Sequence, residues 1–526
     1  MHVLIIKLNL KLPPEVVYYN LSDSNYFCFL DSSLKKNKYS KFSYIAFDPF
    51  FAIKSKERIN VFLDFSNGKT IKEEKDPIEF LEENISKNIN FSFNIKRNEK
   101  REINYFFFDN ITEKFIEKSK TIEKLLPDFK GGFIGYFSYD LKNYIENLPK
   151  TCIDDLDIPD LCLAYFKNVF AFSHKENCWY YVSSYDENED FYNYLNDKKL
   201  NEEIFSNFAK KVESELIKKI KIKTNNEITK NIIDKYINVK ISKVKIFPSI
   251  AKKTYLSKLK KAKEYIHNGD IYQMNFTHRF YSKLPIKIKD FYYILRNINS
   301  APFCAYLNFP EVKIASTSPE RFLYIKKDKI QTRPIKGTMP RGINKKEEKF
   351  FKEKLINSIK DKAELNMIVD LERNDLGRFC KYGSVKVKEH AIIEKYAKVF
   401  HLVSTVIGKI RKNTTFSEIL KSTFPGGSIT GAPKIRAMQI IDELEKYERS
   451  VYTGSIGYIS VDGIVDLNIA IRTFIIKNNY FYYNAGGGIV EDSVPEQEYA
   501  ETLQKGLALK QALKFFQYNN LIKLRR

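Results

Sequence analysis

PFCAYLNFPEVKIASTSPERFLYIK (residues 302–326) is the stretch that decides the fold class. Apolar and β-branched residues form three short runs in it, and only a few residues separate one run from the next. Such runs predict strands, and such short connections predict that neighbouring strands are antiparallel. The expected strands here, and others of the same kind further along the chain, lie at 302–309, 312–317, 321–326, 452–460, 464–473 and 480–485.

Long helical segments alternate with these groups of strands. Apolar residues recur at helical spacing over 345–375, 433–447 and 495–515, and each range predicts one helix. Strands in hairpin-like succession, separated by long helices, favour an α+β fold with antiparallel sheets over a doubly wound parallel fold.

The length of the chain predicts more than one structural unit. Its 526 residues exceed what one ordinary hydrophobic core serves. We divide it into an N-terminal region (1–225), a linker rich in Lys, Asn and Ile (226–250) and a C-terminal region (251–515). A helix with one buried face is expected over 202–220, on the apolar repeat Phe205, Phe208, Val212, Leu216 and Ile220.

Composition excludes several classes of protein. The net charge of +23 comes from Lys spread along the whole chain rather than from a basic stripe, so we expect no nucleic-acid partner. The six cysteines form no CxxC pair and are expected to be reduced thiols. The first residues, MHVLIIKLNLKLPP, are too short an apolar run for a signal peptide, and no run approaches a membrane span. A soluble cytoplasmic enzyme is predicted.

Two pairs of carboxylates are spaced three residues apart in predicted helices. Asp361 and Glu364 form one pair, and Glu498 and Glu501 form the other. Residues three apart share a helix face, so each pair brings two like charges together. A hard cation such as Mg²⁺ prefers oxygen ligands and would relieve this repulsion. The alternative is that both pairs are solvated helix faces.

Three further segments carry candidate chemistry for a small anionic substrate. Lys336 lies in RPIKGT between Pro334 and Gly337, and a lysine in such a rigid turn can act as a nucleophile if its pKa is lowered. Glu320, across a predicted hairpin, could act as a general acid. Arg472 could clamp a carboxylate with two hydrogen bonds.

Two glycine-rich segments predict anion sites. FPGGSITGAPKIRAM (424–438) leads into a helix, but Ala432 and Pro433 stand where a phosphate loop has Lys and Ser or Thr. The helix N-terminus still suits a carboxylate as well as a phosphate. NAGGGIVEDSVPEQEYAET (484–502) would bring backbone N–H groups to an anion beside the second carboxylate pair.

The motifs together resemble those of the chorismate-utilising enzymes, which include the large subunits of anthranilate synthase and aminodeoxychorismate synthase. The resemblance is dense from about 250 to 512 and weaker in FLDSS (29–33) and GGFIGYFSYDL (131–141). It implies a composite α+β fold, in which two large, mostly antiparallel sheets pack together with helices outside. The motifs that carry it are NGDIYQMNF, STSPERF, RPIKGTMPRG, KDKAELNMIVDLERNDLGR, HLVSTV, FPGGSITGAPKIRAMQIIDELE, RSVYTGSIGYI, DLNIAIRT and AGGGIVEDSVPEQEYAET.

Two positions discriminate within this family. Isochorismate and salicylate synthases have a water-activating lysine where this chain has Gln273, so the resemblance implies an amino-transferring enzyme. Anthranilate synthases have Ala, in PIAGT, where this chain has Lys336. One major class of aminodeoxychorismate synthase component I has Lys there, and that lysine is thought to add at C2 of chorismate before ammonia enters at C4. The alternatives are anthranilate synthase component I and a non-catalytic regulatory subunit that binds chorismate or tryptophan.

The resemblance also implies roles for individual residues. Glu320 resembles the general acid for the leaving 4-hydroxyl group, and His401 the histidine near the ring. Glu364 and Glu501 resemble the Mg²⁺ ligands, with Asp361 and Glu498 close by or acting through water. The residues that resemble substrate-carboxylate contacts are Ser428, Thr430, Tyr452, Arg472, Gly486, Gly488 and Lys505.

A regulatory pocket and a partner subunit are also expected from the resemblance. Ser32 and Pro302 match loosely the motifs that line a tryptophan pocket in this family, although Asp31 replaces the usual Glu. No cysteine lies in a glutaminase nucleophile elbow, so ammonia is expected from a separate glutamine amidotransferase subunit. A fused aminodeoxychorismate lyase is not expected.

Overall fold

Residues 302–326 form three strands in a computed structural model of the chain. These are β15 (Phe303–Asn308), β16 (Lys313–Ser318) and β17 (Arg321–Lys326). β15 and β16 form an antiparallel hairpin in one sheet, whereas β17 belongs to a second sheet. The chain therefore passes from one sheet to the other at Pro319 and Glu320. The structure describes residues 1–34, 37–91, 103–112, 114–115, 126–185, 202–236, 245–283 and 286–505.

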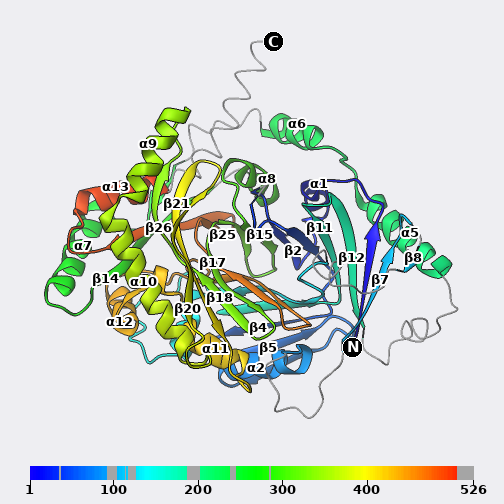
Figure 1. The fold of residues 1–526 in the computed structure, drawn as a ribbon, viewed down its shortest axis with the longest axis horizontal. Helices are drawn as coiled ribbons and strands as arrows, with labels where there is room; N and C mark the ends of the chain where they lie inside the picture. Colours follow the sequence, from blue (N-terminus) through cyan, green and yellow to red (C-terminus); the bar gives the residue numbers. More distant parts are fainter. Residues whose placement is uncertain are drawn as a thin grey trace.

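Two large sheets dominate the described residues (Figure 1). All neighbouring strands are antiparallel except β1 and β7, so the predicted α+β fold with two mostly antiparallel sheets is confirmed. The first sheet has the order β13 (Phe247–Pro248), β14 (Gln273–Lys283), β26 (Tyr480–Ile489), β25 (Thr473–Lys477), β16, β15, β2 (Phe27–Asp31), β3 (Phe42–Ala46), β11 (Asn168–Ser173), β12 (Cys178–Tyr185), β1 (His2–Leu8), β7 (Asn104–Asp109) and β8 (Lys114–Phe115), and β22 (Gly431–Ala432) pairs with β14. The second has the order β19 (Ile335–Pro340), β21 (Val399–Lys409), β18 (Lys329–Arg333), β17, β24 (Val465–Asn468), β23 (Ser455–Ser460), β9 (Gly132–Phe137), β10 (Leu161–Phe166), β4 (Phe51–Lys56), β5 (Ile59–Asp64) and β6 (Thr70–Glu74), and β20 (Lys386–Lys395) pairs with β21.

The N-terminal and C-terminal parts of the chain each form one continuous half of both sheets, and the halves meet at one strand pair in each sheet. β2 pairs with β15, so Asp31 lies opposite Cys304, and β9 pairs with β23. The division into regions 1–225 and 251–515 stays a prediction, and each region supplies strands to each sheet. The segment proposed as a linker contains most of helix α6 (Asn225–Tyr236), and 237–244 lies outside the described residues.

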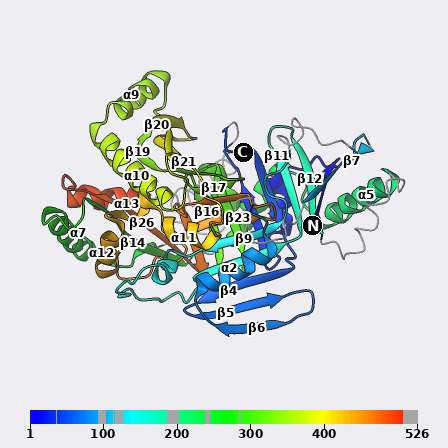
Figure 2. The ribbon, with the colours of Figure 1, turned by 60° about the horizontal axis from the view of Figure 1, so that its bottom comes forward.

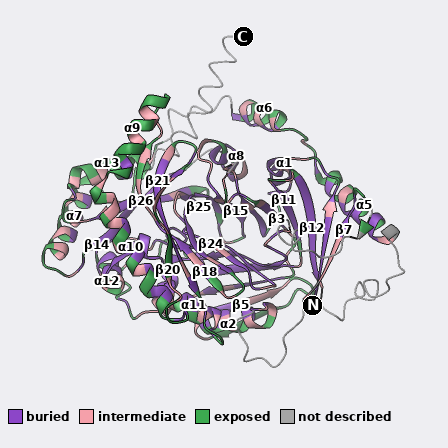
Figure 3. Cartoon of the chain, in the orientation of Figure 1, coloured by how far each residue is buried: buried purple, intermediate pink, exposed green. Residues whose placement is uncertain are grey.

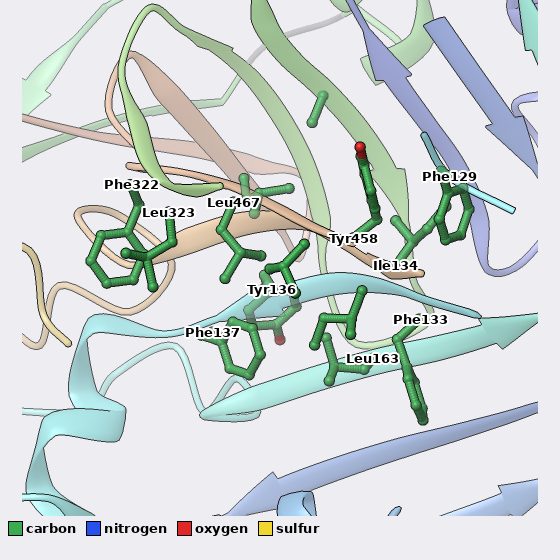
Figure 4. Close-up of a cluster of buried hydrophobic side chains, with 14 of the residues drawn as sticks. Phe129, Phe133, Ile134, Tyr136, Phe137, Leu163, Phe322, Leu323, Tyr458 and Leu467 are labelled. Carbon is green, nitrogen blue, oxygen red and sulfur yellow. The ribbon is translucent and has the colours of Figure 1, made fainter. Parts of the chain in front are cut away.

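The hydrophobic core follows from the alternation of side chains along the strands. In β1, Val3 and Ile5 join a cluster that contains residues of both sheets, whereas Leu4 and Ile6 join a cluster with the outer helices. The first cluster is the layer between the sheets, and Figure 4 shows part of it around Phe137 of β9. Figure 3 shows most of the strands buried and the helices exposed on their outer sides. Both faces of the first sheet are therefore covered.

Helices cover the outside of the sheets (Figures 1 and 2). Figure 2 places α9 and β6 at opposite edges of the molecule. Among the described residues, no helix is both long and apolar enough to cross a membrane. The helices are α1 (Pro14–Leu21), α2 (Pro77–Asn88), α5 (Glu202–Lys219), α6, α7 (Lys252–His267), α8 (Ile288–Ile298), α9 (Lys345–Ile356), α10 (Ile359–Gly377), α11 (Phe416–Thr423), α12 (Lys434–Leu444) and α13 (Pro495–Lys505), with 3-10 turns η1 (Tyr139–Tyr144) and η3 (Gly427–Ile429).

The helix predictions were confirmed at 202–220 and 433–447, but the single helix predicted at 345–375 was wrong. The chain there forms α9 and α10, which are separated by Asn357 and Ser358. The Ser358 side chain accepts a hydrogen bond from the Asp361 amide (3.2 Å) and caps α10, which starts a new helix where the apolar spacing alone continues the old one. The helix predicted at 495–515 begins as α13, and 506–515 lies outside the described residues.

Candidate active site

Glu320 and Arg472 lie at two adjacent crossovers between the sheets. Glu320 connects β16 to β17, and Arg472 ends the connection from β24 to β25. Because β16 pairs with β25 and β17 with β24, the two crossovers run side by side. The Ile469 amide donates to the Glu320 carbonyl (3.0 Å), and the Thr317 amide donates to the Arg472 carbonyl (3.2 Å). The topology thus brings a carboxyl group and a guanidinium group together.

Glu320 is a buried carboxyl group. Glu320 is only 4% exposed, and its Oε1 accepts a long hydrogen bond from the Ile335 amide (3.4 Å). Burial raises its pKa to about 7, against the opposing effects of the Ser428 hydroxyl and the Lys336 charge. At neutral pH a large fraction of Glu320 is therefore protonated, which a general acid requires.

Lys336 is a half-buried lysine on the edge strand β19. Its Nζ donates to the carbonyl oxygen of Ser428 at 3.3 Å. A methyl group built on Gly488 would lie 3.4 Å from this Nζ and would overlap the amide nitrogen of Gln273. Burial lowers the pKa of Lys336, and the carboxylates of Glu364 and Glu320 oppose that shift. A lysine with a lowered pKa offers the neutral amine that a nucleophile requires.

Gln273 and His401 each carry a buried, unpartnered polar atom. Oε1 of Gln273 and Nε2 of His401 are buried and have no hydrogen-bond partner among the described residues. Nδ1 of His401 is 2.9 Å from the Thr338 hydroxyl, and burial lowers the pKa of His401 to about 3, so the ring is neutral. Buried polar atoms are normally hydrogen-bonded. These two therefore mark a place for polar groups of a substrate.

Arg472 is a half-buried cation without a carboxylate partner. Within the described residues its guanidinium group makes one hydrogen bond, a long one from Nη1 to Oδ1 of Asn299 (3.5 Å), and it forms no ion pair there. Tyr396 is close to it, stacks edge-on against His401 at 4.8 Å and donates from its hydroxyl group to the Pro319 carbonyl (3.1 Å). An unpaired guanidinium group of this kind fits a substrate carboxylate.

The two glycine-rich segments meet on β14 of the first sheet. Gly486 and Gly488 of β26 lie opposite Thr277 and Asn275. A side chain on Gly486 would overlap the Phe276 carbonyl, so only glycine fits.

Three further predicted contacts lie in different surroundings. Lys505 donates to the Gly486 carbonyl (2.7 Å) and pairs with Glu501 (2.7 Å). The Thr430 hydroxyl donates to the Gly426 carbonyl (2.9 Å), so its hydrogen is used by the loop itself. Tyr452 is buried near Arg449, and burial raises its pKa.

The four predicted metal ligands come from α10 and α13. Burial raises the pKa of Glu364, and Asp361 and Glu498 raise it further against two lysines. Burial and Glu501 likewise raise the pKa of Glu498, which accepts a hydrogen bond from Ser493 (2.7 Å). The four carboxylates thus repel one another, and such an all-oxygen set fits a hard divalent cation.

Two glycines leave room beside these carboxylates. A methyl group on Gly487 would lie 3.1 Å from Oε2 of Glu498 and 3.8 Å from Oε1 of Glu501. Gly337, next to Lys336, has a positive φ of 72° and would crowd Asp361 (3.0 Å) if it carried a Cβ. In the described ranges no three Asp, Glu, His or Cys side chains already converge on one metal position. The donors fit Mg²⁺ by their chemistry, because all of them are carboxylate oxygens.

A separate cavity of about 380 Å³ contains the two residues predicted for a tryptophan pocket. Ser32 and Pro302 both line it, and the Ser32 hydroxyl donates to the Pro302 carbonyl (3.1 Å). Asp31 also lines it, but its carboxylate accepts two hydrogen bonds from Arg296 (2.7 and 3.1 Å). None of the predicted catalytic or metal-binding residues lines this cavity.

Sequence reasoning missed three buried charged residues beside the site. Glu372 of α10 has an unpartnered Oε2, and burial and then Glu320 raise its pKa. Glu445 and Arg449 form a buried ion pair (2.7 Å) next to Tyr452. The signal was present as Glu and Arg four residues apart in ELEKYER, but that spacing is also common on exposed helix surfaces.

Comparison with known proteins identifies the family. The family model described as chorismate binding enzyme matches residues 75–511. Aminodeoxychorismate synthase component 1 of Bacillus subtilis is 36% identical over 387 residues, which cover 74% of this chain and 78% of the relative. Anthranilate synthase component 1 of Aquifex aeolicus is 35% identical over 422 residues, which cover 79% and 81%. The crystal structure of anthranilate synthase component I from Streptococcus pneumoniae matches with a TM-score of 0.68 and 30% identity, over 90% of this chain and 93% of that one. The chain therefore belongs to the chorismate binding enzyme family.

Proposed function

We propose that this chain is component 1 of an aminodeoxychorismate synthase, which converts chorismate and ammonia to 4-amino-4-deoxychorismate for 4-aminobenzoate and folate synthesis. The observation that carries the proposal is the environment of Lys336. Its amine lies beside the buried carboxyl group of Glu320, next to Gln273 and Gly488, with a lowered pKa. An anthranilate synthase that carries Ala at this position lacks that amine.

The proposed reaction uses Lys336 and Glu320 in sequence. The neutral amine of Lys336 adds at C2 of chorismate, the ring double bond shifts, and the C4–O bond breaks. Glu320 donates its proton to the departing hydroxyl group, which leaves as water. The ammonium of the lysine adduct returns a proton to the Glu320 carboxylate. Ammonia then adds at C4, the double bond shifts back, and the C2–N bond breaks. One proton of the new C4 ammonium group passes to the departing lysine nitrogen, which restores the neutral amine of Lys336. Chorismate and ammonia thus give aminodeoxychorismate and water.

The remaining residues are proposed to bind and orient the substrate. Arg472 has no carboxylate partner in the described structure, which supports a role in holding a substrate carboxylate with Tyr452 and Gly486. Ser428, Thr430, Gly488 and Lys505 are proposed for the second carboxylate. Neutral His401 is proposed to donate or accept one hydrogen bond at the ring, and Gln273 cannot serve as the base that would admit water instead of ammonia.

Glu364 and Glu501 are proposed to hold Mg²⁺, with Asp361 and Glu498 close by. The support is that burial raises the pKa of Glu364 and of Glu498, and that neighbouring carboxylates of the same set raise both pKa values further. When bound, Mg²⁺ would supply positive charge for a substrate carboxylate next to the glycine-rich strand β26.

The ammonia is proposed to come from a separate glutamine amidotransferase subunit. The relatives described as component 1 support a second component, because their names imply one. A cytoplasmic location is proposed on the six cysteines, all of which are free.

The second candidate function is anthranilate synthase component I. The similarity to the Aquifex aeolicus protein supports it, because its identity to this chain, 35%, is close to the 36% of aminodeoxychorismate synthase component 1 of Bacillus subtilis. The cavity that Ser32 and Pro302 line is proposed to bind free tryptophan under either function, as an inhibitor or as a structural ligand.

Product analysis tests the proposal directly. Purified protein is incubated with chorismate, Mg²⁺ and ammonium chloride, and the product is identified by chromatography and mass spectrometry. Aminodeoxychorismate, converted to 4-aminobenzoate when a lyase is added, is the expected product. Anthranilate with pyruvate release would instead establish the second candidate.

A further inference from the structure

Arg449 is a buried arginine whose five N–H groups all have acceptors. The residue is 2% exposed. Nε and Nη2 donate to the two carboxylate oxygens of Glu445 at 2.9 and 2.7 Å. Nη1 donates to the Ile429 carbonyl (2.9 Å) and, at 3.4 Å, to the Thr453 hydroxyl. The second hydrogen of Nη2 goes to the Asn275 carbonyl at 2.6 Å.

These acceptors belong to three segments of the candidate active site. Ile429 follows Ser428, whose carbonyl oxygen accepts a hydrogen bond from the Lys336 amine. Asn275 lies on β14, two residues after Gln273. Thr453 follows Tyr452, a proposed substrate contact. One guanidinium group therefore ties the loop 427–430, the strand β14 and the turn after residue 449 together.

The partners of Arg449 bind the same segments to each other. Oε1 of Glu445 also accepts a hydrogen bond from the Thr277 amide (2.8 Å) on β14. The Asn275 amide donates to the Thr430 carbonyl (2.7 Å), and its side chain donates to the Ile429 carbonyl (3.2 Å). The loop that presents the Ser428 carbonyl is thus fixed to β14 by direct bonds and through the ion pair.

The N-terminal region closes the remaining side of this ion pair. The ring of Tyr139 lies under the guanidinium group, 4.6 Å from Cζ to the ring centroid. The carboxylate of Asp140 accepts from the Ser450 amide (2.8 Å), and the Tyr139 amide donates to the Ser450 carbonyl (2.8 Å). Residues more than 300 positions away in the sequence therefore position the turn that carries Tyr452.

We propose that Arg449 and Glu445 are positioning residues that hold the loop 427–430 and Tyr452 in register with Gln273 and Lys336. This inference rests on the proposed function only in that the same site converts chorismate. The arrangement of acceptors around Arg449 requires arginine, because the three N–H groups of a lysine all lie on one nitrogen atom. A lysine therefore cannot reach a carboxylate and two separate carbonyls in one plane.

The experiment compares Arg449→Lys and Glu445→Gln with the wild type and with Arg296→Lys. Arg296 forms an equally buried two-bond pair with Asp31, away from the loop, and is the matched control. Hydrogen exchange of a peptide covering 424–433 reports the loop, and kcat and KM for chorismate report turnover to whichever product the wild type makes. All measurements are made below the unfolding temperature of each variant.

Both site variants should speed exchange in 424–433 and lower kcat between about tenfold and 100-fold, since displacement of reacting groups by about 1 Å has such effects. Arg296→Lys should lower the unfolding temperature without changing exchange in 424–433. Loop exchange within about twofold of wild type in both site variants, or faster exchange with unchanged kcat, would overturn the inference. If Arg449→Lys does not fold, Glu445→Gln alone decides.

The outcomes separate this inference from the proposed function. If the wild type makes anthranilate, the proposed function fails, yet the effect of Arg449 on loop exchange and kcat is still measured on that reaction. If the wild type makes aminodeoxychorismate and both variants behave like the control, the inference fails while the proposed function stands.

Discussion

Nζ of Lys336 lies 3.3 Å from the carbonyl oxygen of Ser428 and donates a hydrogen bond to it. This bond joins the edge strand β19 to the glycine-rich loop 427–430. A carbonyl acceptor orients the amine without neutralising it by an ion pair. Burial at the same time lowers the pKa of Lys336. This combination favours a lysine that is fixed in place and deprotonates readily, which is what the covalent route requires.

Replacing Lys336 with Ala should lower aminodeoxychorismate formation by at least about 100-fold, because the covalent route loses its nucleophile. Some anthranilate formation is expected in its place. The measurement is product analysis at saturating chorismate, Mg²⁺ and ammonium. The exposed Lys352→Ala on α9 is the control and should keep wild-type turnover. Unchanged aminodeoxychorismate turnover in Lys336→Ala would defeat the covalent role.

Replacing Glu320 with Gln should abolish most turnover, since a general acid typically contributes about 10²- to 10⁴-fold, but should stabilise the fold at alkaline pH. In the folded protein the pKa of Glu320 is about 7, against an ordinary 4.5. Between those values the folded state holds a proton that the unfolded state releases, so wild-type stability falls as pH rises from about 4.5 to about 7. The loss is on the order of 3 kcal/mol and is complete above pH 7.

Urea denaturation at pH 4.5 and pH 8 measures this effect. Glu320→Gln does not titrate, so its stability relative to wild type should rise between the two pH values. Glu353→Gln, at a side chain that is 58% exposed on α9, is the control for the substitution itself. An equal stability difference for Glu320→Gln at both pH values would show that the Glu320 carboxyl titrates normally.

The fold class was predictable from the sequence, but the way in which the chain brings Glu320 and Arg472 together was not. Apolar runs separated by two or three residues imply antiparallel neighbours, and this held for β15 and β16. The passage of the chain from one sheet to the other at Glu320, and again at Arg472, depends on contacts between distant strands. Local spacing carries no information on such contacts.

A helix cap and a buried ion pair account for the other differences between the predictions and the structure. The break between α9 and α10 depends on one serine side chain, whereas the apolar spacing continues across it. Arg449 and Glu445 have the spacing of an ordinary surface pair, and only the packing of Tyr139 and β14 around them makes the pair internal. Residues whose roles depend on three or four distant segments are the ones that spacing does not reveal.

Replacing Glu364 or Glu501 with Gln should raise the Mg²⁺ concentration needed for half-maximal activity, because an amide oxygen binds a hard cation more weakly than a carboxylate. Burial of Glu364 should make the effect larger there than at Glu501, which is half exposed and paired with Lys505. Activity is titrated with Mg²⁺ after removal of metal with a chelator, and Glu353→Gln again serves as the control. Wild-type Mg²⁺ dependence in both variants would refute the metal assignment.

Free tryptophan should bind the cavity lined by Ser32 and Pro302. A substitution that fills this cavity should leave the reaction at the proposed active site unaffected. The cavity of about 380 Å³ is in the range of pockets for small ligands. Calorimetric titration with tryptophan should release heat with the wild type, whereas Ser32→Phe, which places a ring in the cavity, should abolish that heat. No heat from the wild type at millimolar tryptophan would contradict the hypothesis.

Because no proposed catalytic residue lines the cavity, Ser32→Phe should form the same product as the wild type. A change of product would mean that the cavity and the proposed active site are connected.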